Sequence, residues 1–231
     1  MEKFSALNSC TVSNAKCICF DLLTPEEQEL INKNQIQVRY KKGEVICKHG
    51  TFASHVIYLK EGLAKVYLEG LNDSLILKII TSGNLIGLTA IMEDNNVFHS
   101  SAMAYVDSSA SLIDINVFRK IVKQNAAFAN SIINILCENS LQTFGRFFCL
   151  THKQLYGRMA DIILCLAERI FKDRRFELNL SRKELAELTG MSTESVIRML
   201  KKFKDDGIIE LQGKTVNISN YELLRKISEY G

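Results

Sequence analysis

Two charged side chains, Glu194 and Arg198, lie four residues apart in the C-terminal third of the sequence. In a helix this spacing places both of them on the same side. An arginine can donate two hydrogen bonds to O6 and N7 of guanine, and a glutamate can accept one from N4 of cytosine. The same two residues could instead form a surface ion pair worth about 0.3–0.5 kcal/mol. The elements that carry them therefore decide their role.

The residues around this pair predict two short helices joined by a tight turn. Ser181 and Glu184 form a capping box that opens the first helix, and Ser192 caps a second one that runs to about Lys204. Gly190 lies in the turn between them. One apolar face is shared by five residues: Leu185, Leu188, Val196, Leu200 and Phe203. This pattern is a helix-turn-helix, whose second helix enters the major groove of DNA with its N-terminal part.

A β-hairpin is predicted directly after the second helix. Residues 208–211 and 216–218 are strand-like, and the turn between them contains Gly213 and Lys214. A hairpin in this place makes the motif a winged helix, and Lys214 at its tip could reach a DNA phosphate. We expect the DNA contacts from eight residues: Ser181, Arg182, Ser192, Thr193, Glu194, Arg198, Lys201 and Lys214.

The charge distribution agrees with this interpretation. The chain has 231 residues and a formal net charge of +3, from 29 Lys+Arg and 26 Asp+Glu. All of that excess lies in residues 152–231, and residues 169–204 carry ten basic and five acidic side chains. A basic segment in a near-neutral chain points to nucleic acid, although a solvated helical face would give the same count.

The preceding part of the chain predicts a β domain followed by a long helix. Short alternating segments separated by glycines run from Val38 to Ile115, as in a sandwich, roll or barrel. The period then becomes helical, with a long helix over 126–148. The predicted fold class is α+β: an N-terminal β-roll (jelly roll), a long helix and a C-terminal winged helix-turn-helix. The expected divisions are an arm at 1–23, the roll at 24–124, the helix at 125–150 and the DNA-binding domain at 151–231.

The long helix has two partly apolar faces. One contains Phe128, Ile132, Ile135 and Asn139, and the other contains Ile133, Leu136, Ser140, Thr143 and Phe147. Two faces predict two partners, the helix's own domain and a second helix, which could be its symmetry mate in a homodimer. Burial within a single chain is the alternative.

Taken together, these segments resemble the Crp/Fnr family (catabolite activator and fumarate-nitrate regulators) of bacterial transcription regulators. The resemblance covers about residues 20–220. It rests on Gly83-Asn84-Leu85-Ile86-Gly87, the long helix, the stretch from Met191 to Arg198, and Gly213-Lys214-Thr215. It implies a cyclic-nucleotide-binding-like roll, base-reading roles for Glu194 and Arg198, and a third, variable reader at Thr193. Double-stranded DNA, RNA polymerase and a second copy of the chain are the implied partners.

The resemblance also locates a pocket for a small-molecule effector in the roll. Members that bind cAMP carry a Gly-Glu and an Arg-Ser pair there, whereas this sequence has Gly87-Leu88 and Ser100-Ser101. Loss of the arginine removes a charge-assisted contact to the phosphate, so we expect no tight cAMP binding, and the effector stays open. The expected pocket residues are Leu85, Gly87, Leu88, His99, Ser100 and Ser101.

The seven cysteines form three groups. Cys10, Cys17 and Cys19 precede the first helix, as in the redox-sensing branch that holds a [4Fe–4S] cluster, but their spacing differs and the roll lacks the matching fourth cysteine. Since a cluster normally needs four thiolates, we expect a reduced arm and no cluster, with redox or metal sensing as the alternative. Cys47 lies in the roll. Cys137, Cys149 and Cys165 are predicted to be free core thiols.

Other classes of protein find little support. The roll's histidines do not cluster as in a cupin-like metal enzyme, and neither a GxSxG nor a P-loop pattern occurs. We therefore expect no enzymatic activity. No apolar run reaches the roughly 18 residues of a membrane helix and no secretory signal is seen. A cytoplasmic protein with no membrane partner is the expectation.

Overall fold

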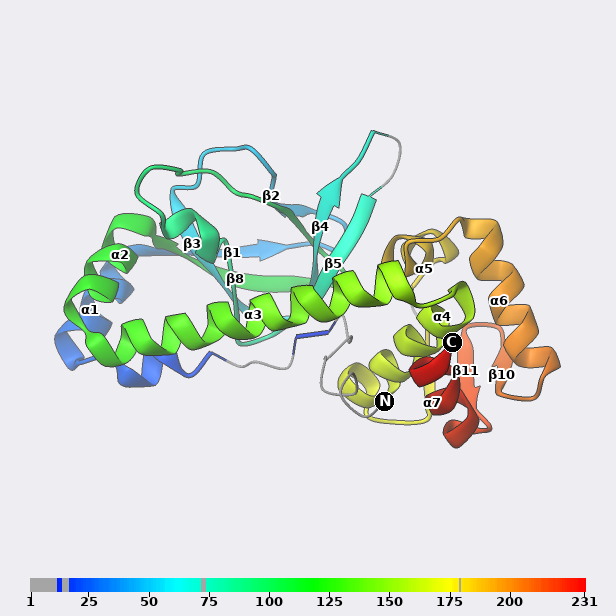
Figure 1. The fold of residues 1–231 in the computed structure, drawn as a ribbon. Helices are drawn as coiled ribbons and strands as arrows, with labels where there is room; N and C mark the ends of the chain where they lie inside the picture. The colour runs from blue at the N-terminus through cyan, green and yellow to red at the C-terminus, as the bar shows by residue number, and fades with distance from the viewer. Residues whose placement is uncertain (1–11, 14–16, 72–73, 179) are drawn as a thin grey trace. The chain divides into compact units, whose positions relative to one another are not determined.

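The computed structural model describes residues 12–13, 17–71, 74–178 and 180–231 (Figure 1). Its contacts divide the chain into two compact units. One unit comprises Ser13–Leu71 and Lys78–Ser140 and contains most of a β-roll. The other includes Leu141–Gly231 and contains the helix-turn-helix. The long helix α3 contributes residues to both.

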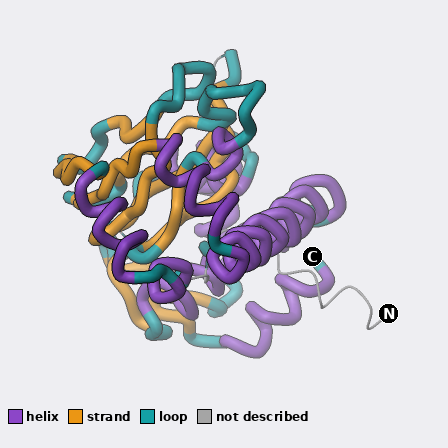
Figure 2. The backbone as a smooth tube through the Cα atoms, turned by 90° about the vertical axis from the view of Figure 1, so that its left-hand side faces the viewer, coloured by secondary structure: helices purple, strands orange, loops and turns teal. Residues whose placement is uncertain are grey.

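Two antiparallel four-stranded sheets form the roll, and both are visible as orange strands in Figure 2. The first has the order β1 (Gln35–Tyr40), β8 (Ser108–Asp114), β3 (His55–Glu61), β6 (Asn84–Ile86). The second has the order β2 (Val45–Cys47), β7 (Ser101–Ala104), β4 (Leu63–Glu69), β5 (Ser74–Thr81). The β region therefore starts at Gln35, three residues before the predicted start, because all six residues of β1 pair with β8.

The core of the roll lies between the two sheets. Ile57, Leu59 and Ile113 from the first sheet and Ala64 and Val66 from the second are buried in one cluster. Helices α1 (Pro25–Lys33) and α2 (Ile115–Gln124) pack against each other at one end of the roll (Figure 1). The predicted capping box of α1 is present, since Thr24 and Glu27 hydrogen-bond reciprocally. Short 3₁₀ turns, η2 (Cys19–Leu22) and η3 (Leu88–Ile91), complete this unit.

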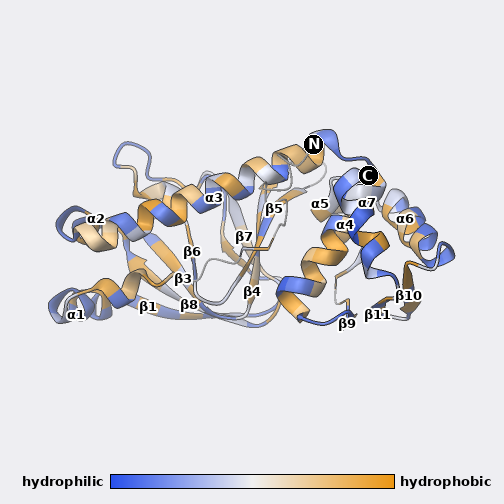
Figure 3. Cartoon of the chain, turned by 60° about the horizontal axis from the view of Figure 1, so that its bottom comes forward, coloured by the Kyte–Doolittle hydropathy of each residue, from blue (hydrophilic) through white to orange (hydrophobic). Residues whose placement is uncertain are grey.

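Helix α3 (Ala126–His152) is four residues longer than predicted. As expected, one face is buried, with Phe128 and Ile132 almost inaccessible. The opposite face leaves four large apolar side chains exposed by 56–66%: Ile133, Leu141, Phe144 and Phe147. Hydrophobic colour accordingly recurs along this helix in Figure 3. Leu136 was predicted for this exposed face but packs against the roll core instead.

After α3, the C-terminal unit contains the predicted winged helix-turn-helix and two elements that the sequence analysis did not predict. Its elements are α4 (Leu155–Cys165), the π-helical segment η4 (Leu166–Phe171), β9 (Arg175–Glu177), α5 (Arg182–Thr189), α6 (Thr193–Asp205), β10 (Ile209–Gln212), β11 (Thr215–Ile218) and α7 (Tyr221–Tyr230). Strand β9 and helix α7 were not predicted. Phe176 of β9 pairs with Val216 of β11, so the hairpin belongs to a three-stranded sheet, β10-β11-β9.

The described cysteines depart from the expectation in three places. Cys17 and Cys19 form a disulfide and are not reduced thiols, and Cys165 is buried but also disulfide-bonded. Cys137 is exposed, because it lies on the outer face of α3, and is therefore not a core thiol. Cys10 lies outside the described residues. No described helix is long and apolar enough to cross a membrane.

Candidate nucleic-acid interface

The turn between α5 and α6 depends on one glycine. Gly190 ends α5 in the left-handed region at φ 62°. A Cβ atom there would lie 2.8 Å from Cδ2 of Leu150. A side chain at this position would meet both backbone strain and a steric clash, so the glycine sets the path from the first helix to the second.

Helix α6 is amphipathic, and its buried and exposed faces are the ones that the sequence predicts. Val196, Leu200 and Phe203 are at most 2% exposed and pack inward. Glu194, Arg198, Ile197 and Lys201 lie on the accessible side. The N-terminal half of the helix thus presents both an acceptor and a donor to solvent.

Glu194 and Arg198 do not neutralise each other. Among the ion pairs of the described residues, none joins these two side chains, and Nη2 of Arg198 instead donates to Oγ of Ser195 at 3.4 Å. Hydrogen bonds from its own backbone N–H and from the Ser192 hydroxyl hold the pKa of Glu194 below its usual value. The carboxylate is therefore ionised at neutral pH and acts only as an acceptor.

Two of the residues predicted to contact DNA, Ser181 and Ser192, also serve as helix caps. Oγ of Ser181 accepts from the Glu184 N–H at 3.1 Å, and Oγ of Ser192 accepts from the Ser195 N–H at 3.2 Å. Both residues stand at helix N-termini, where backbone N–H groups and the helix dipole favour anions. Arg182 and Thr193, the first residues of α5 and α6, are half-buried beside them.

The wing places Lys214 at its tip. Strands β10 and β11 pair from Ile209↔Ile218 to Gln212↔Thr215, which leaves Gly213 and Lys214 as the turn. Gly213 has φ 61° and supplies the left-handed residue that such a turn requires. The Lys214 side chain is exposed, while its carbonyl oxygen accepts from the Leu178 N–H at 2.8 Å.

Buried polar contacts hold the helix-turn-helix on the end of α3. The guanidinium of Arg146, 3% exposed, donates to the carbonyl oxygen of Leu188 near the end of α5. Asp161 of α4 accepts from Nζ of Lys153 at 2.7 and 2.8 Å, from Sγ of Cys149 at 3.2 Å, and from the Ser228 hydroxyl of α7. One carboxylate therefore connects α3, α4 and α7.

Tyr156 of α4 fixes the C-terminal end of α6. Its hydroxyl donates to Oδ2 of Asp206 at 2.6 Å, and its ring centroid lies 4.4 Å from that of Phe203. The ammonium of Lys202 lies 4.5 Å from the same ring centroid, within cation–π range. The sequence contains no local signal for this contact, because 50 residues separate Tyr156 from Asp206.

In the roll, one predicted effector-pocket segment, residues 85–88, lies beside Phe98, the residue directly before the other predicted segment. Gly87, with φ 82°, lies against Phe98, whose Cε1 would be 2.7 Å from a Cβ at position 87. Leu85 and Leu88 are buried in the same core cluster as Phe98. Ser101 is fully buried; its hydroxyl accepts from the His49 N–H at 3.0 Å and donates to Glu69 at 3.1 Å. Ser100 is half-buried and its carbonyl oxygen accepts from Sγ of Cys47 at 3.9 Å.

His99, the remaining pocket candidate, is only partly satisfied. Its Nε2 lies 2.8 Å from Nδ2 of Asn95, whereas Nδ1 is buried and has no hydrogen-bond partner. Within the described part of the chain, no group of three His, Cys, Asp or Glu side chains is arranged to hold a metal ion.

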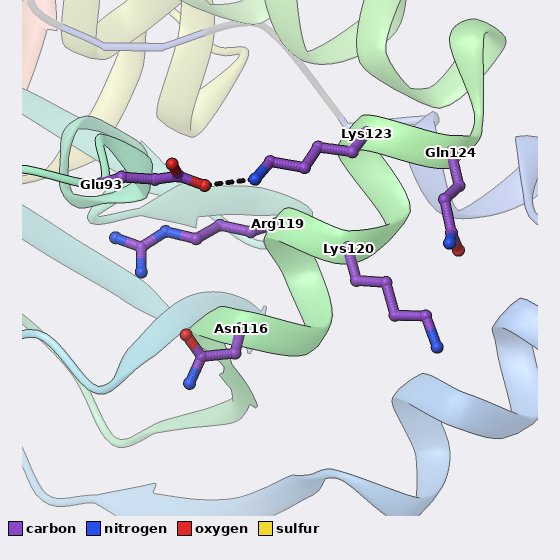
Figure 4. A pocket seen from close by; sticks show the side chains of 6 residues that line it. All are labelled: Glu93, Asn116, Arg119, Lys120, Lys123 and Gln124. Atoms are coloured by element: carbon purple, nitrogen blue, oxygen red, sulfur yellow. Dashed lines mark hydrogen bonds and ion pairs between the residues drawn. The ribbon is translucent and has the colours of Figure 1, made fainter.

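A separate surface hollow of about 440 Å³ lies along α2 (Figure 4). Arg119 in its wall donates to the carbonyl oxygens of Ala90, Ile91 and Met92 at 2.8–2.9 Å. Lys123 pairs with Glu93 across it. Because the Arg119 guanidinium is occupied by backbone oxygens, its role is to hold the η3 turn next to Gly87.

A helix-turn-helix with an exposed charged second helix and a following β-hairpin defines a winged-helix DNA-binding protein, here on one chain with a β-roll. Two family models match the chain: a Crp-like helix-turn-helix domain over residues 157–227 and a cyclic nucleotide-binding domain over residues 37–125. The chain belongs to the Crp/Fnr family and is a DNA-binding transcription regulator.

Individual relatives agree with this assignment. The fumarate and nitrate reduction regulatory protein of Yersinia pestis is 26% identical over 227 residues, covering 95% of this chain and 88% of that protein. The fold is shared with a transcriptional regulator of the Crp/Fnr family from Eubacterium rectale (TM-score 0.79, 20% identity, 92% of this chain and 98% of that one). It is also shared with FixK2 of Bradyrhizobium japonicum (TM-score 0.74, 19% identity, 84% and 96%).

Proposed function

We propose that this regulator binds a near-palindromic promoter site as a homodimer, with α6 of each copy in the major groove. Glu194 and Arg198 read base edges, Arg198 through guanine and Glu194 through cytosine. The observation that carries this proposal is the exposure of both side chains on α6 without an ion pair between them. Thr193 is the third, variable reader on the same helix.

The remaining interface residues bind the DNA backbone. Ser181, Arg182, Ser192, Lys201 and Lys214 supply hydroxyl or cationic groups at the starts of α5 and α6, along α6 and on the wing. Contacts of this kind set the position of the protein on the duplex and carry no sequence information of their own. The DNA-binding role belongs to residues 151–231 and the sensing role to the roll, residues 24–124.

Dimerisation is assigned to the outer face of α3. Ile133, Cys137, Ser140, Phe144 and Phe147 follow one another at intervals of four, three, four and three residues and are all exposed. That spacing is the a/d pattern of a two-stranded coiled coil. Burying such side chains against a second copy would stabilise the dimer by about 25 cal/mol per Å² of apolar surface.

The roll responds to a small-molecule effector other than cAMP, bound near Leu85, Gly87, Leu88, His99, Ser100 and Ser101. No arginine occupies the position expected to hold a cyclic phosphate. The regulator contacts RNA polymerase and works in the cytoplasm, where its DNA target lies. Titration calorimetry with cAMP should give no micromolar binding; a micromolar Kd would contradict the effector assignment.

The test of base reading is a gel-shift series with Arg198→Ala on the wild-type site and on single-base variants of it. Loss of a bidentate contact to guanine should cost about 1–3 kcal/mol of specific binding and remove discrimination at one position in each half-site. Unchanged discrimination would refute the assignment of Arg198.

Lys214→Ala is the matched control, because it removes one cation from the wing without touching α6. It should weaken binding to all sequences alike and lower the slope of log affinity against log salt by about one. A change in base preference in this variant would assign base reading to the wing.

A further inference from the structure

Arg146 of α3 is a charged side chain that the fold removes almost completely from water. It is 3% exposed, and Nη2 of its guanidinium donates to the carbonyl oxygens of Leu188 and, at 3.2 Å, of Ile76. Burial lowers its pKa, but an arginine stays protonated in a protein. Among the ion pairs of the described residues, none includes Arg146. A full positive charge is therefore held by main-chain oxygens.

Such a charge is costly to bury. The Nε atom of Arg146 is also buried and, within the described part of the chain, has no hydrogen-bond partner. An unpaired buried donor costs stability, and apolar residues of similar volume often replace buried ionic groups without loss of stability. Stability alone therefore does not account for an arginine at this position, and its two acceptors indicate another role.

Both acceptors are carbonyl groups of a kind that secondary structure leaves without a partner. Leu188 lies in the last turn of α5, where carbonyl oxygens lack an intrahelical N–H and the helix dipole favours a cation. Ile76 lies in β5, the edge strand of its sheet. By their contacts, residues 74–77 of β5 belong to the same compact unit as residues 141–231. Within that unit, one guanidinium joins α3, the start of β5 and the end of α5.

The turn that follows α5 rests on the same elements. A Cβ atom at Gly190 would lie 2.8 Å from Cδ2 of Leu150 in α3 and 4.0 Å from Cδ1 of Leu75 in β5. Only Gly190 and Met191 lie between the end of α5 and Ser192, the cap of α6. Because this connection is so short, the position of the first turn of α6 follows that of the end of α5.

We propose that Arg146 is a positioning residue for DNA recognition, which holds the end of α5 and thereby directs Glu194 and Arg198 at the base edges. Arg146 does not contact DNA itself, since its side chain is buried. The proposal rests on the base-reading assignment made above and extends it to α3. When the two hydrogen bonds of Arg146 are lost, α6 shifts, and the bidentate contact to guanine suffers most because both of its hydrogen bonds depend on the direction of one side chain.

Gel-shift titrations test this role with Arg146→Met, an apolar side chain of similar length. The DNA is the wild-type site and the same site with the guanine that we assign to Arg198 replaced. Affinity for the wild-type site should fall about tenfold and affinity for the replaced site only slightly, so discrimination at this position falls about tenfold. Equal losses on both sites would show a merely structural role and refute the proposal.

The salt dependence gives a second readout. Arg146→Met should leave the slope of log affinity against log salt unchanged, because it removes no phosphate contact. A slope lowered by about one would make Arg146 a phosphate-binding residue and would also overturn the proposal.

Two further variants serve as controls. Arg146→Lys keeps the charge without the planar guanidinium, so its discrimination should lie between those of the wild type and Arg146→Met. It decides the question if circular dichroism shows that Arg146→Met does not fold, since wild-type discrimination in Arg146→Lys would contradict the proposal. Arg169→Met removes a guanidinium that donates to the Val12 carbonyl oxygen at 2.9 Å and should discriminate like the wild type. An equal loss of discrimination in Arg169→Met would show that the effect is not specific to Arg146.

The double variant Arg146→Met/Arg198→Ala separates this proposal from the base-reading assignment. If Arg146 acts through Arg198, the double variant should lose less affinity for the wild-type site than the product of the two single losses. Losses that multiply would show independent effects and refute the positioning role. Unchanged discrimination in Arg198→Ala alone would refute base reading. Loss of discrimination in Arg198→Ala but not in Arg146→Met would refute only the role of Arg146.

Discussion

The accessible side chains of α6 differ in what each can recognise on a base pair. Glu194 only accepts hydrogen bonds and Arg198 only donates them. Ile197, between them, is 52% exposed and has only apolar surface to offer. The C5-methyl of thymine is the apolar group that the major groove presents, so Ile197 is suited to contact a thymine beside the bases that we propose Glu194 and Arg198 read.

Replacing single thymines of the operator by uracil should reveal this contact. Loss of one buried methyl group costs about 0.8 kcal/mol, so wild-type affinity should fall about fourfold at one thymine in each half-site. Ile197→Ala should bind the thymine and uracil sites equally well. Fluorescence anisotropy on the matched duplexes measures both; uniform wild-type affinity across all uracil substitutions would exclude a methyl contact.

Two buried thiols should be chemically silent in the folded protein. Burial raises the pKa of Cys47 and of Cys149 to about 12 in each case. Since the thiolate is the reactive form, iodoacetamide at pH 8 should label neither residue in native protein and both after unfolding in guanidinium chloride. Reactivity should rise only as the pH approaches 12. Rapid native labelling of either residue, read by peptide mass spectrometry, would show that its site is open to solvent.

At the scale of elements, the outer face of α3 is the clearest unpartnered surface of the described residues. Its spacing predicts that two parallel helices meet with Cys137 facing its counterpart. Mild oxidation should therefore convert the 26.2 kDa chain into a covalent dimer on non-reducing gels. Cys137→Ser should abolish this product. Free Cys47 and Cys149 are both buried and should not replace it.

A charge in the same seam should prevent association. Phe144 is 60% exposed in the single chain, so Phe144→Glu should leave folding intact while two carboxylates repel each other across the seam. Analytical ultracentrifugation should show a dimer for the wild type and a monomer for this variant. A dimer in both proteins would place the interface elsewhere.

The sequence predicts those elements whose signals are local. The capping boxes at Thr24 and Ser181, the inward residues of α5 and α6 and the turn at Gly213 all depend on neighbours within a few positions, and all are present. Helix α7 also has a local signal, because Asn220 caps it by accepting from the Leu223 N–H and an apolar spacing follows. Helix α7 was therefore predictable from the sequence, although it is not among the predicted elements.

Other features depend on distant partners and have no local signal. The spacing of Leu136 places it on the exposed face of α3, yet its side chain packs against the roll core. In the sequence, Asp161 is a single acidic residue in an apolar helix. The structure shows that its carboxylate accepts hydrogen bonds from Lys153, Cys149 and Ser228. The disulfide of Cys17 with Cys19 joins residues only two positions apart, but the sequence does not distinguish this pair from two reduced thiols in an N-terminal arm.

At the scale of the whole molecule, the position of the net charge favours the approach to DNA. The excess of +3 lies in the residues that carry the winged helix, so in a dimer both DNA-reading units are positive. Such a field raises the rate of encounter with DNA and makes binding sensitive to salt. Association in the proposed dimer thus doubles both the base contacts and the electrostatic attraction.

Footprinting should show two half-sites whose centres lie about 34 Å apart, one turn of the duplex, because a dyad would relate the two α6 helices of the proposed dimer. Phe144→Glu should lose the paired footprint while keeping the same half-site preference at higher protein concentration. A wild-type footprint confined to one half-site would argue that a single copy binds DNA.

The contact between Gly87 and Phe98 has a consequence for engineering. A side chain at position 87 meets backbone strain and the Phe98 ring at once, so a random library over the roll will lose most members that vary this glycine. Leu88 and Ser100 lie beside the pair without its backbone constraint. A library designed to give this regulator a new inducer should therefore vary Leu88 and Ser100 and keep Gly87 and Phe98 constant. Such a library is smaller, and a larger fraction of its members should fold.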